Sequence, residues 1–167
     1  MTSSSAPSGS GRPTGSDQSS AEGAVALAAS LCAERGVRLT AIRRQVLELL
    51  YEMDAPRGAY DLVQALQEKV GRNIAPPTVY RALEFLIEQG LAAKIESRNA
   101  YAPCTHPERP DDCLFFICSD CGGMSEIEDP GVGQQLQRSA AGLGFKVSRR
   151  VVEVQGTCAS CSEAKPA

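Results

Sequence analysis

The stretch 76-PPTVYRALEFLIEQGLAAKIESRNAYAP-103 decides the fold of this chain. Two prolines open it, and proline suits the first helical turn because its missing N–H has no helical partner there. Apolar side chains then recur at helical spacing up to Gly90. Two short β-like runs follow at 91–96 and 100–103, joined by a turn at Ser97-Arg98-Asn99. A helix followed by a small hairpin is typical of a winged helix, a helix-turn-helix relative with a β wing.

Three further helices are predicted before this stretch. Residues 24–35 carry one apolar side, the residues from Thr40 to Met53 follow with Thr40 as N-cap, and residues 60–70 form the third helix. Glycine at 36, 71 and 90 ends each helix that it follows. The apolar positions that mark the four helices are Val25, Ala28, Leu31, Cys32, Ile42, Val46, Leu49, Leu50, Met53, Tyr60, Leu62, Val63, Leu66, Val70, Val79, Leu83, Leu86 and Ile87.

The sequence changes character after residue 102. A buried-strand run at 113–118, a second strand at 123–128, a short helix at 132–141 and an alternating strand at 145–155 are predicted. This α+β unit of about 60 residues has no large core of its own, so we expect a metal or a partner to stabilise it.

Length and composition set the domain plan. The chain has 167 residues, which suits one domain or two small ones. We expect a disordered, Ser-rich tail at 1–23, a winged-helix domain at 24–102, a second domain at 103–162 and a short tail at 163–167. No apolar run approaches the length of about 20 residues that a membrane span needs, and no secretion signal is present. We therefore expect a cytoplasmic protein.

Charge is distributed unevenly along the chain. The net charge is −3, but residues 35–98 hold ten bases and eight acids and form the only basic segment. A local basic face can bind phosphate on an acidic protein, because screening limits distant charges to about 8–10 Å. A solvated face of mixed charge is the alternative, and charge alone favours it.

Two CxxC pairs, Cys118-Ser-Asp-Cys121 and Cys158-Ala-Ser-Cys161, predict a metal site. Four thiolates complete the tetrahedron that zinc prefers, and a closed Cys₄ site is structural because no coordination position stays open. The alternatives are a redox pair or two unrelated buried pairs. A thioredoxin-like pair would open a helix in a βαβ context, which the sequence lacks.

A second cluster is predicted where the two units join. Cys104 and Cys113 bracket a polar loop that contains Asp111 and His106, the only histidine. A metal here could couple binding to the position of the DNA-reading helix. The alternative is a polar loop with an incidental histidine and a packed cysteine. Cys32, on an apolar helix face, is expected to be a core residue.

Several motifs together resemble the ferric uptake regulator family, and within it the zinc-sensing branch. They are GVRLTAIRRQVLELL at 36–50, PPTVYRALEFLIEQGL at 76–91, FFICSDCG at 115–122 and the second CxxC. The resemblance covers about residues 24–161. It implies a homodimer with an N-terminal winged helix and a C-terminal dimerisation domain that carries the Cys₄ zinc. It also implies zinc-dependent binding to a palindromic DNA operator and repression of metal-uptake genes.

The resemblance assigns DNA contacts by position. The helix from Pro77 to Gln89 is the recognition helix, and its first turns carry Thr78, Tyr80 and Arg81, where base contacts are made. Arg43, Arg44 and Arg57 would contact phosphates. The alternatives are a partly buried Tyr80 and an ion pair between Arg81 and Glu84 or Glu88.

The resemblance also implies a regulatory zinc site of a cysteine, histidines and a glutamate. Cys104 and Glu126 match the cysteine and the glutamate, whereas Ala93 and Asp111 stand where histidines are usual. Four ligands can still be drawn from Cys104, His106, Asp111, Cys113 and Glu126. A thiolate-rich set favours zinc over ferrous iron. We therefore expect one structural and one regulatory zinc per protomer.

Other functions remain open at this point. Cys104 or Cys113 could be oxidised in a redox or peroxide sensor, or the cluster could sense another metal. A CxxC pair could serve a thiol oxidoreductase, and a zinc ribbon could bind protein rather than DNA. The sequence has no nucleophile–base–acid set, no phosphate loop and no paired catalytic carboxylates. We therefore expect neither an enzyme nor a small-molecule substrate.

Overall fold

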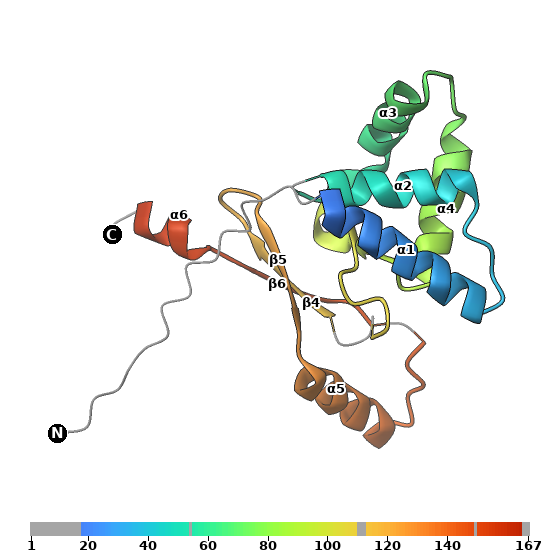
Figure 1. The fold of residues 1–167 in the computed structure, drawn as a ribbon. Helices are drawn as coiled ribbons and strands as arrows, with labels where there is room; N and C mark the ends of the chain where they lie inside the picture. Colours follow the sequence, from blue (N-terminus) through green and yellow to red (C-terminus); the bar gives the residue numbers. More distant parts are fainter. Residues whose placement is uncertain (1–17, 54, 110–112, 149, 165–167) are drawn as a thin grey trace.

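The computed structural model describes residues 18–53, 55–109, 113–148 and 150–164. Figure 1 shows helices α1 to α4 gathered on one side of the molecule and the sheet β4–β5–β6 beside them, with α5 and α6 beyond. Most of the predicted N-terminal tail and Asp111 lie outside the described residues, as do the last three residues of the predicted C-terminal tail. None of the described helices is long and apolar enough to span a membrane.

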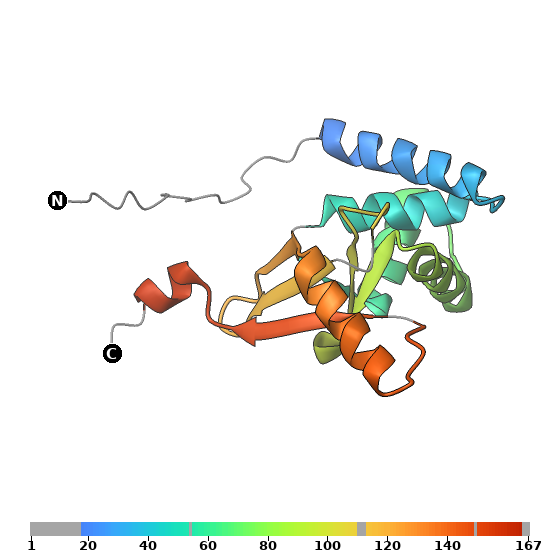
Figure 2. The same cartoon turned by 90° about the horizontal axis from the view of Figure 1, so that it is seen from below.

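The predicted winged helix is present. Its elements are α1 (Gln18–Glu34), α2 (Ala41–Glu52), β1 (Arg57–Gly58), α3 (Ala59–Val70), α4 (Pro76–Glu88), β2 (Ala92–Ile95), the 3₁₀ turn η1 (Glu96–Arg98) and β3 (Ala100–Pro103). Strands β2 and β3 form the predicted hairpin, and β1 pairs on the other edge of β3. Asn99 adopts the left-handed conformation (φ 48°) that closes the hairpin turn. Figure 2 shows α1 as the outermost helix, lying along α2.

One apolar core holds this unit together. Its buried members all lie between Val25 and Ala92 and come from α1 to α4 and the residues that follow. Burial of these side chains is the main term that stabilises the fold. Cys32 is buried among them, as predicted.

Three predictions for this unit need correction. α1 begins at Gln18, so residues 18–23 are helical and do not belong to the tail. Tyr60 is 70% exposed and is not a core residue, because it lies on the solvent side of the first turn of α3. β1 was not predicted, because two residues show no periodicity and its pairing partner Tyr101 lies 44 residues further along.

The C-terminal unit consists of β4 (Cys113–Cys118), β5 (Met124–Glu128), α5 (Pro130–Gly142), β6 (Val152–Gly156) and α6 (Ala159–Ala164). β4 is the central strand, antiparallel to β5 and parallel to β6. α5 starts two residues before its predicted start, because the Asp129 carboxylate accepts hydrogen bonds from the N–H groups of Gly131 and Val132. α6 was not predicted.

The strand predicted at 145–155 is wrong over residues 145–148, 150 and 151; residue 149 lies outside the described residues. β6 begins only at Val152, which pairs with Leu114 near the start of β4. Phe145, in the segment before β6, is 67% exposed.

A second apolar cluster lies where the two units meet. Ile95, Ala102 and Cys104 from the wing side pack against the inward face of β4. That face carries Cys113, Phe115 and Ile117, which alternate with outward residues as expected for a strand. Two cysteines are thus buried at the contact between the wing and the sheet.

Candidate metal centres and DNA-binding surface

Four cysteines gather at one end of the C-terminal sheet. The sulfurs of Cys118, Cys121, Cys158 and Cys161 all lie within 4.8 Å of one another. The parallel pairing of β4 with β6 brings the two CxxC pairs together, since Cys118 lies opposite Gly156 in the register. The Sγ atoms of Cys121 and Cys158 are 3.8 Å apart. The geometry thus places the four predicted ligands in one group.

Backbone N–H groups point at these sulfurs. The N–H of Cys158 donates to Cys118 Sγ (3.3 Å), and the N–H of Gly123 donates to Cys121 Sγ (3.4 Å). Hydrogen bonds from the backbone N–H groups of Cys121 and Cys158 lower the pKa of Cys118 to about 6. The pKa of Cys161 is raised to about 12, because its thiol proton is held by Cys158 and its neighbours. A divalent cation would supply the charge that lets all four ionise, and four thiolates fit zinc.

A second group lies at the base of the wing, buried under the helical unit. The ligand atoms of Cys104, Cys113 and Glu126 lie within 4.8 Å of one another. Cys104 Sγ is 3.6 Å from both Cys113 Sγ and Glu126 Oε1. The backbone N–H of Thr105 donates to both oxygens of Glu126 (3.3 and 3.1 Å), which orients the carboxylate toward the sulfurs. We call these three residues the junction cluster.

The Glu126 carboxylate lies against two buried thiols in the junction cluster. Burial, and then the nearby Glu126 carboxylate, raise the pKa of Cys104 to about 11. Burial and the same carboxylate raise the pKa of Cys113 further. Two buried thiols and a partly buried carboxylate are thus held together, and a bound divalent cation would favour the ionised form of both thiols. The donor set fits a thiophilic cation such as zinc.

The only histidine does not join this group. His106 is 48% exposed on its side chain, and its Nδ1 lies 3.9 Å from Glu128, which also pairs with Arg109 at 2.6 Å. The expectation that His106 is a ligand therefore lacks geometric support. Asp111 is outside the described residues, so the described residues contribute three ligands to the cluster.

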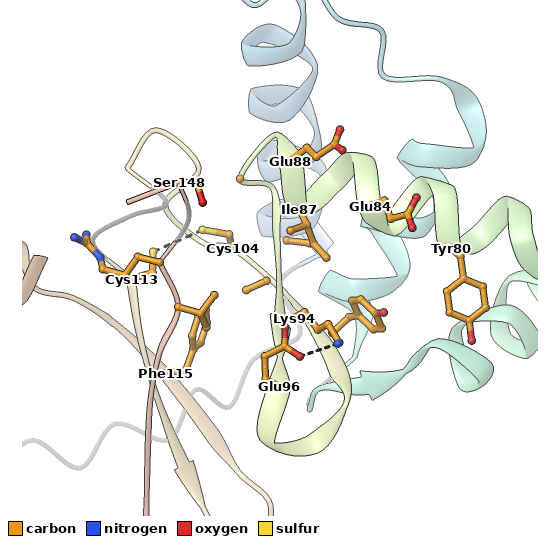
Figure 3. A pocket seen from close by; sticks show the side chains of 16 residues that line it. Tyr80, Glu84, Ile87, Glu88, Lys94, Glu96, Cys104, Cys113, Phe115 and Ser148 are labelled. Atoms are coloured by element: carbon orange, nitrogen blue, oxygen red, sulfur yellow. Dashed lines mark hydrogen bonds and ion pairs between the residues drawn. The ribbon is translucent and has the colours of Figure 1, made fainter. Parts of the chain in front are cut away.

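A cavity of about 780 Å³ opens beside the junction cluster. Figure 3 shows Cys104 and Cys113 side by side at one end of the cavity and Tyr80 of α4, the predicted recognition helix, at the other. Glu84 and Glu88 of α4 also line the cavity. The cavity therefore separates the C-terminal sheet from the recognition helix, and a relative movement of the two would change its size.

The predicted base-contacting residues are accessible on α4. Thr78 and Arg81 are exposed and Tyr80 is 46% exposed, while Val79 and Ala82 on the same helix are buried. Among the ion pairs of the described residues, none joins Arg81 to Glu84 or Glu88. The alternative of an ion-paired Arg81 is thus not supported, whereas an exposure of 46% is compatible with the alternative of a partly buried Tyr80.

The predicted phosphate contacts differ from one another. Arg44 and Arg57 are exposed. The guanidinium of Arg43 lies 3.6 Å from the centre of the Phe85 ring and donates to the carbonyl of Arg38 (2.6 Å), so it also supports the fold. Tyr60, exposed in the first turn of α3 beside Arg57, is a surface candidate that sequence reasoning missed because its spacing matched the apolar stripe.

Comparison with known proteins gives these sites a context. The model of the ferric uptake regulator family matches residues 34–155. The chain belongs to the ferric uptake regulator family. Within this family, the zinc uptake regulation protein of Escherichia coli (strain K12) is 42% identical to the chain over 140 residues, which cover 83% of this chain and 81% of the relative.

Solved structures of family members agree with this assignment. A structure described as a zinc uptake regulator complexed with zinc and DNA has a TM-score of 0.78 at 41% identity and covers 86% of this chain and 96% of that chain. The holo crystal structure of XcZur has a TM-score of 0.75 at 41% identity and covers 83% of this chain and 96% of that one. The apo structure of XcZur, also 41% identical, covers 86% and 99% but has a TM-score of only 0.50. Our structure is therefore closer to the holo than to the apo arrangement of that family member.

Proposed function

We propose that this member of the ferric uptake regulator family is a zinc-responsive transcriptional repressor. As a dimer, it would bind a palindromic operator of metal-uptake genes when zinc occupies the junction cluster. The observation that carries this proposal is the grouping of two buried thiols with the partly buried Glu126 carboxylate where the wing meets the C-terminal sheet. The similarity to zinc uptake regulators, one of them solved with zinc and DNA, supports the same function.

Two zinc ions per protomer have different roles in this proposal. Zinc held by Cys118, Cys121, Cys158 and Cys161 would be structural, because four thiolates leave no open position. Regulatory zinc would be held by Cys104, Cys113 and Glu126. Asp111 or a water molecule would complete the tetrahedron, and His106 would not take part.

The junction cluster takes ligands from both units. Cys104 follows the wing, whereas Cys113 and Glu126 belong to the C-terminal sheet. Zinc bound to all three favours the arrangement in which the two units are close. Zinc can raise operator affinity only if it binds more tightly to that arrangement than to one in which the units are apart. A coupling of about 1–3 kcal/mol corresponds to roughly 5- to 150-fold.

The proposed DNA contacts follow the exposed residues of the helical unit. Arg81 would read a guanine edge and Tyr80 would pack on a thymine methyl, with Thr78 beside them. Arg43, Arg44 and Arg57 would position the helix through phosphates. Their exposure supports these roles, least for Arg43, which is also engaged with Phe85.

A second copy of the chain would cover the outer face of the C-terminal sheet. Phe116, Ile127 and Val154 share the face opposite to the wing and are 42, 44 and 41% exposed. Three large apolar side chains exposed together favour association. This face supports the proposed dimerisation domain at 103–162, with the winged-helix domain at 24–102.

The cysteine chemistry supports a cytoplasmic location for this regulator. All seven cysteines are free thiols in the described structure, and a reducing compartment keeps them so. We propose no enzymatic activity, in keeping with a family of transcription regulators.

Zinc content tests the metal assignment. We would measure zinc per protomer before and after brief treatment with a mild chelator, in the wild type, Cys113→Ser and Cys32→Ser. Two ions falling to one in the wild type and in Cys32→Ser, with one throughout in Cys113→Ser, would support the proposal. A single ion that never exchanges in the wild type would overturn the regulatory site and leave thiol oxidation as the leading signal.

DNA selection tests the repressor function. The wild-type protein would select duplexes from a random-sequence pool with zinc and, separately, after removal of the exchangeable zinc. Enrichment of a palindrome only with zinc is expected. Equal enrichment in both conditions, or none, would contradict a zinc-responsive repressor.

A further inference from the structure

The tip of the wing rests on the C-terminal sheet through two charged residues. Arg98, the last residue of η1, donates from Nη1 to the carbonyl of Gly122 (3.1 Å) and from Nη2 to the carbonyl of Cys118 (2.7 Å). Glu153 of β6 accepts from the backbone N–H groups of Glu96 (2.6 Å) and Ser97 (3.2 Å). Each end of the three-residue turn η1 is thus held by the C-terminal sheet.

The backbone of the turn that follows the first CxxC pair leaves room for the Arg98 guanidinium. Gly122 has φ +77°, a backbone conformation that side chains rarely adopt. A Cβ at this position would lie 3.0 Å from Arg98 Nη1, so glycine also leaves room for the guanidinium. The two carbonyls that accept from Arg98 lie on either side of Cys121, and the planar guanidinium spans both.

Glu153 is suited to hold the other end of the turn. Burial alone would raise the pKa of its carboxyl group, but hydrogen bonds from the Ser97 side chain and from the backbone of Glu96 and Ser97 outweigh burial and lower it. The carboxylate is therefore ionised at neutral pH. Charged acceptors make stronger hydrogen bonds to backbone N–H groups than neutral ones.

We propose that Arg98 and Glu153 are positioning residues that fix the wing against the C-terminal sheet, so that the Cys₄ centre also sets the position of the DNA-binding unit. The acceptors of Arg98 are carbonyls of the turn that carries Cys118 and Cys121, and that turn keeps its shape while its sulfurs are held. The structural site thereby contributes to DNA binding separately from the junction cluster. The DNA part of this inference rests on the proposed function.

A direct phosphate contact by Arg98 is the competing explanation. The two explanations predict opposite signs for Glu153→Gln. Removing an acidic charge strengthens or preserves binding to DNA if only electrostatic attraction matters. If Glu153 positions the wing, the same substitution weakens binding.

The experiment compares zinc-loaded, full-length Arg98→Ala, Glu153→Gln and wild type. Arg138→Ala is the matched control, because Arg138 is an exposed arginine of α5 that donates a hydrogen bond to Gln134 of the same helix. Three quantities are measured: zinc per protomer, amide hydrogen exchange of residues 92–103, and affinity with its salt dependence for the duplex that the wild type selects. We expect both variants to keep their zinc, to exchange faster in 92–103 and to lose affinity about tenfold with an unchanged salt slope. Arg138→Ala should match the wild type.

Other outcomes separate the explanations. Glu153→Gln binding as tightly as the wild type, with a flatter salt slope in Arg98→Ala, would assign Arg98 to phosphate and overturn the positioning role. Unchanged hydrogen exchange in both variants would also overturn it. If the wild type selects no duplex, the proposed function fails, and hydrogen exchange alone then decides whether Arg98 and Glu153 hold the wing.

Discussion

The phenol oxygen of Tyr51, in α2, donates a hydrogen bond of 2.8 Å to the backbone carbonyl of Cys104. The N–H of Cys104 in turn donates to the carbonyl of Leu91, just beyond the recognition helix (3.1 Å). The side chain of Cys104 faces Cys113 and Glu126 of the sheet. One residue is thus held by the helical unit at its backbone and by the C-terminal sheet at its sulfur.

Tyr51→Phe tests whether this connection transmits the zinc signal. The variant keeps all three sulfur and carboxylate ligands, so zinc should bind the junction cluster with nearly unchanged affinity. Loss of the hydrogen bond should reduce the zinc-induced gain in DNA affinity by about 2- to 10-fold. Titrations of DNA with and without exchangeable zinc measure that gain. An unchanged gain would show that Cys104 communicates through another contact.

Zinc binding at the junction cluster should depend steeply on pH. The pKa of Cys104 is raised to about 11 and that of Cys113 further, so both thiols are protonated at neutral pH without metal. Zinc must displace both protons, and lower pH therefore disfavours binding. We expect apparent affinity to rise about 100-fold per pH unit between pH 6 and 8. Calorimetry in two buffers of different ionisation enthalpy counts the protons, and release of fewer than one would refute the two-thiol set.

Arg81→Ala and Arg44→Ala should weaken DNA binding in different ways. Arg81 lies on the recognition helix, and loss of a bidentate base contact should cost about 1–3 kcal/mol of discrimination at one base pair. Arg44 is exposed on α2, and its loss should weaken all sequences alike and reduce the salt slope by about 1. Competition between matched and mismatched duplexes at several salt concentrations distinguishes the two. If both substitutions reduced discrimination equally, the assignment of Arg81 to a base edge and of Arg44 to a phosphate would be wrong.

Phe116→Glu should prevent dimerisation. Phe116 lies beside Val154 on the exposed face of the sheet, and a charge there would be buried without a partner in the dimer. Sedimentation velocity should find a monomer that retains the structural zinc. Leu27→Ser, at an exposed apolar position of α1, is the control and should remain dimeric. A dimeric Phe116→Glu variant would mean that another surface associates.

Periodicity predicted those elements of the fold that bury a full apolar stripe. The four helices and the hairpin follow from repeating spacing, from prolines 76 and 77, and from the glycines that end helices. β1 and the late start of β6 could not be predicted, because both depend on where a distant strand begins and ends. The exposure of Tyr60 could not be predicted either, because apolar spacing along a helix does not determine which of its faces other elements cover.

The two cysteine groups differ in how far sequence could predict them. CxxC spacing alone pairs Cys118 with Cys121, and tetrahedral zinc chemistry suggested joining both pairs. Cys104 and Cys113 were drawn from local spacing, whereas Glu126 came only from the family resemblance, because it reaches the group through the register of β4 and β5. His106 is close to Cys104 in sequence, but its side chain turns to Glu128 instead.

The parallel pairing of β4 with β6 has a consequence for the order of events during synthesis. The buried residues of the helical core lie between Val25 and Ala92, so that core is complete early in translation. The N–H of Cys158 donates to the sulfur of Cys118, 40 residues earlier in the chain. Contacts between residues so far apart in sequence form slowly during folding. The nascent chain therefore has a folded DNA-binding unit before the ribosome has delivered the cysteines that close the metal centre. The structural metal centre is therefore completed last, and a chain that fails at this step would keep its helical core but lose the support that the proposed Cys₄ centre gives to the wing.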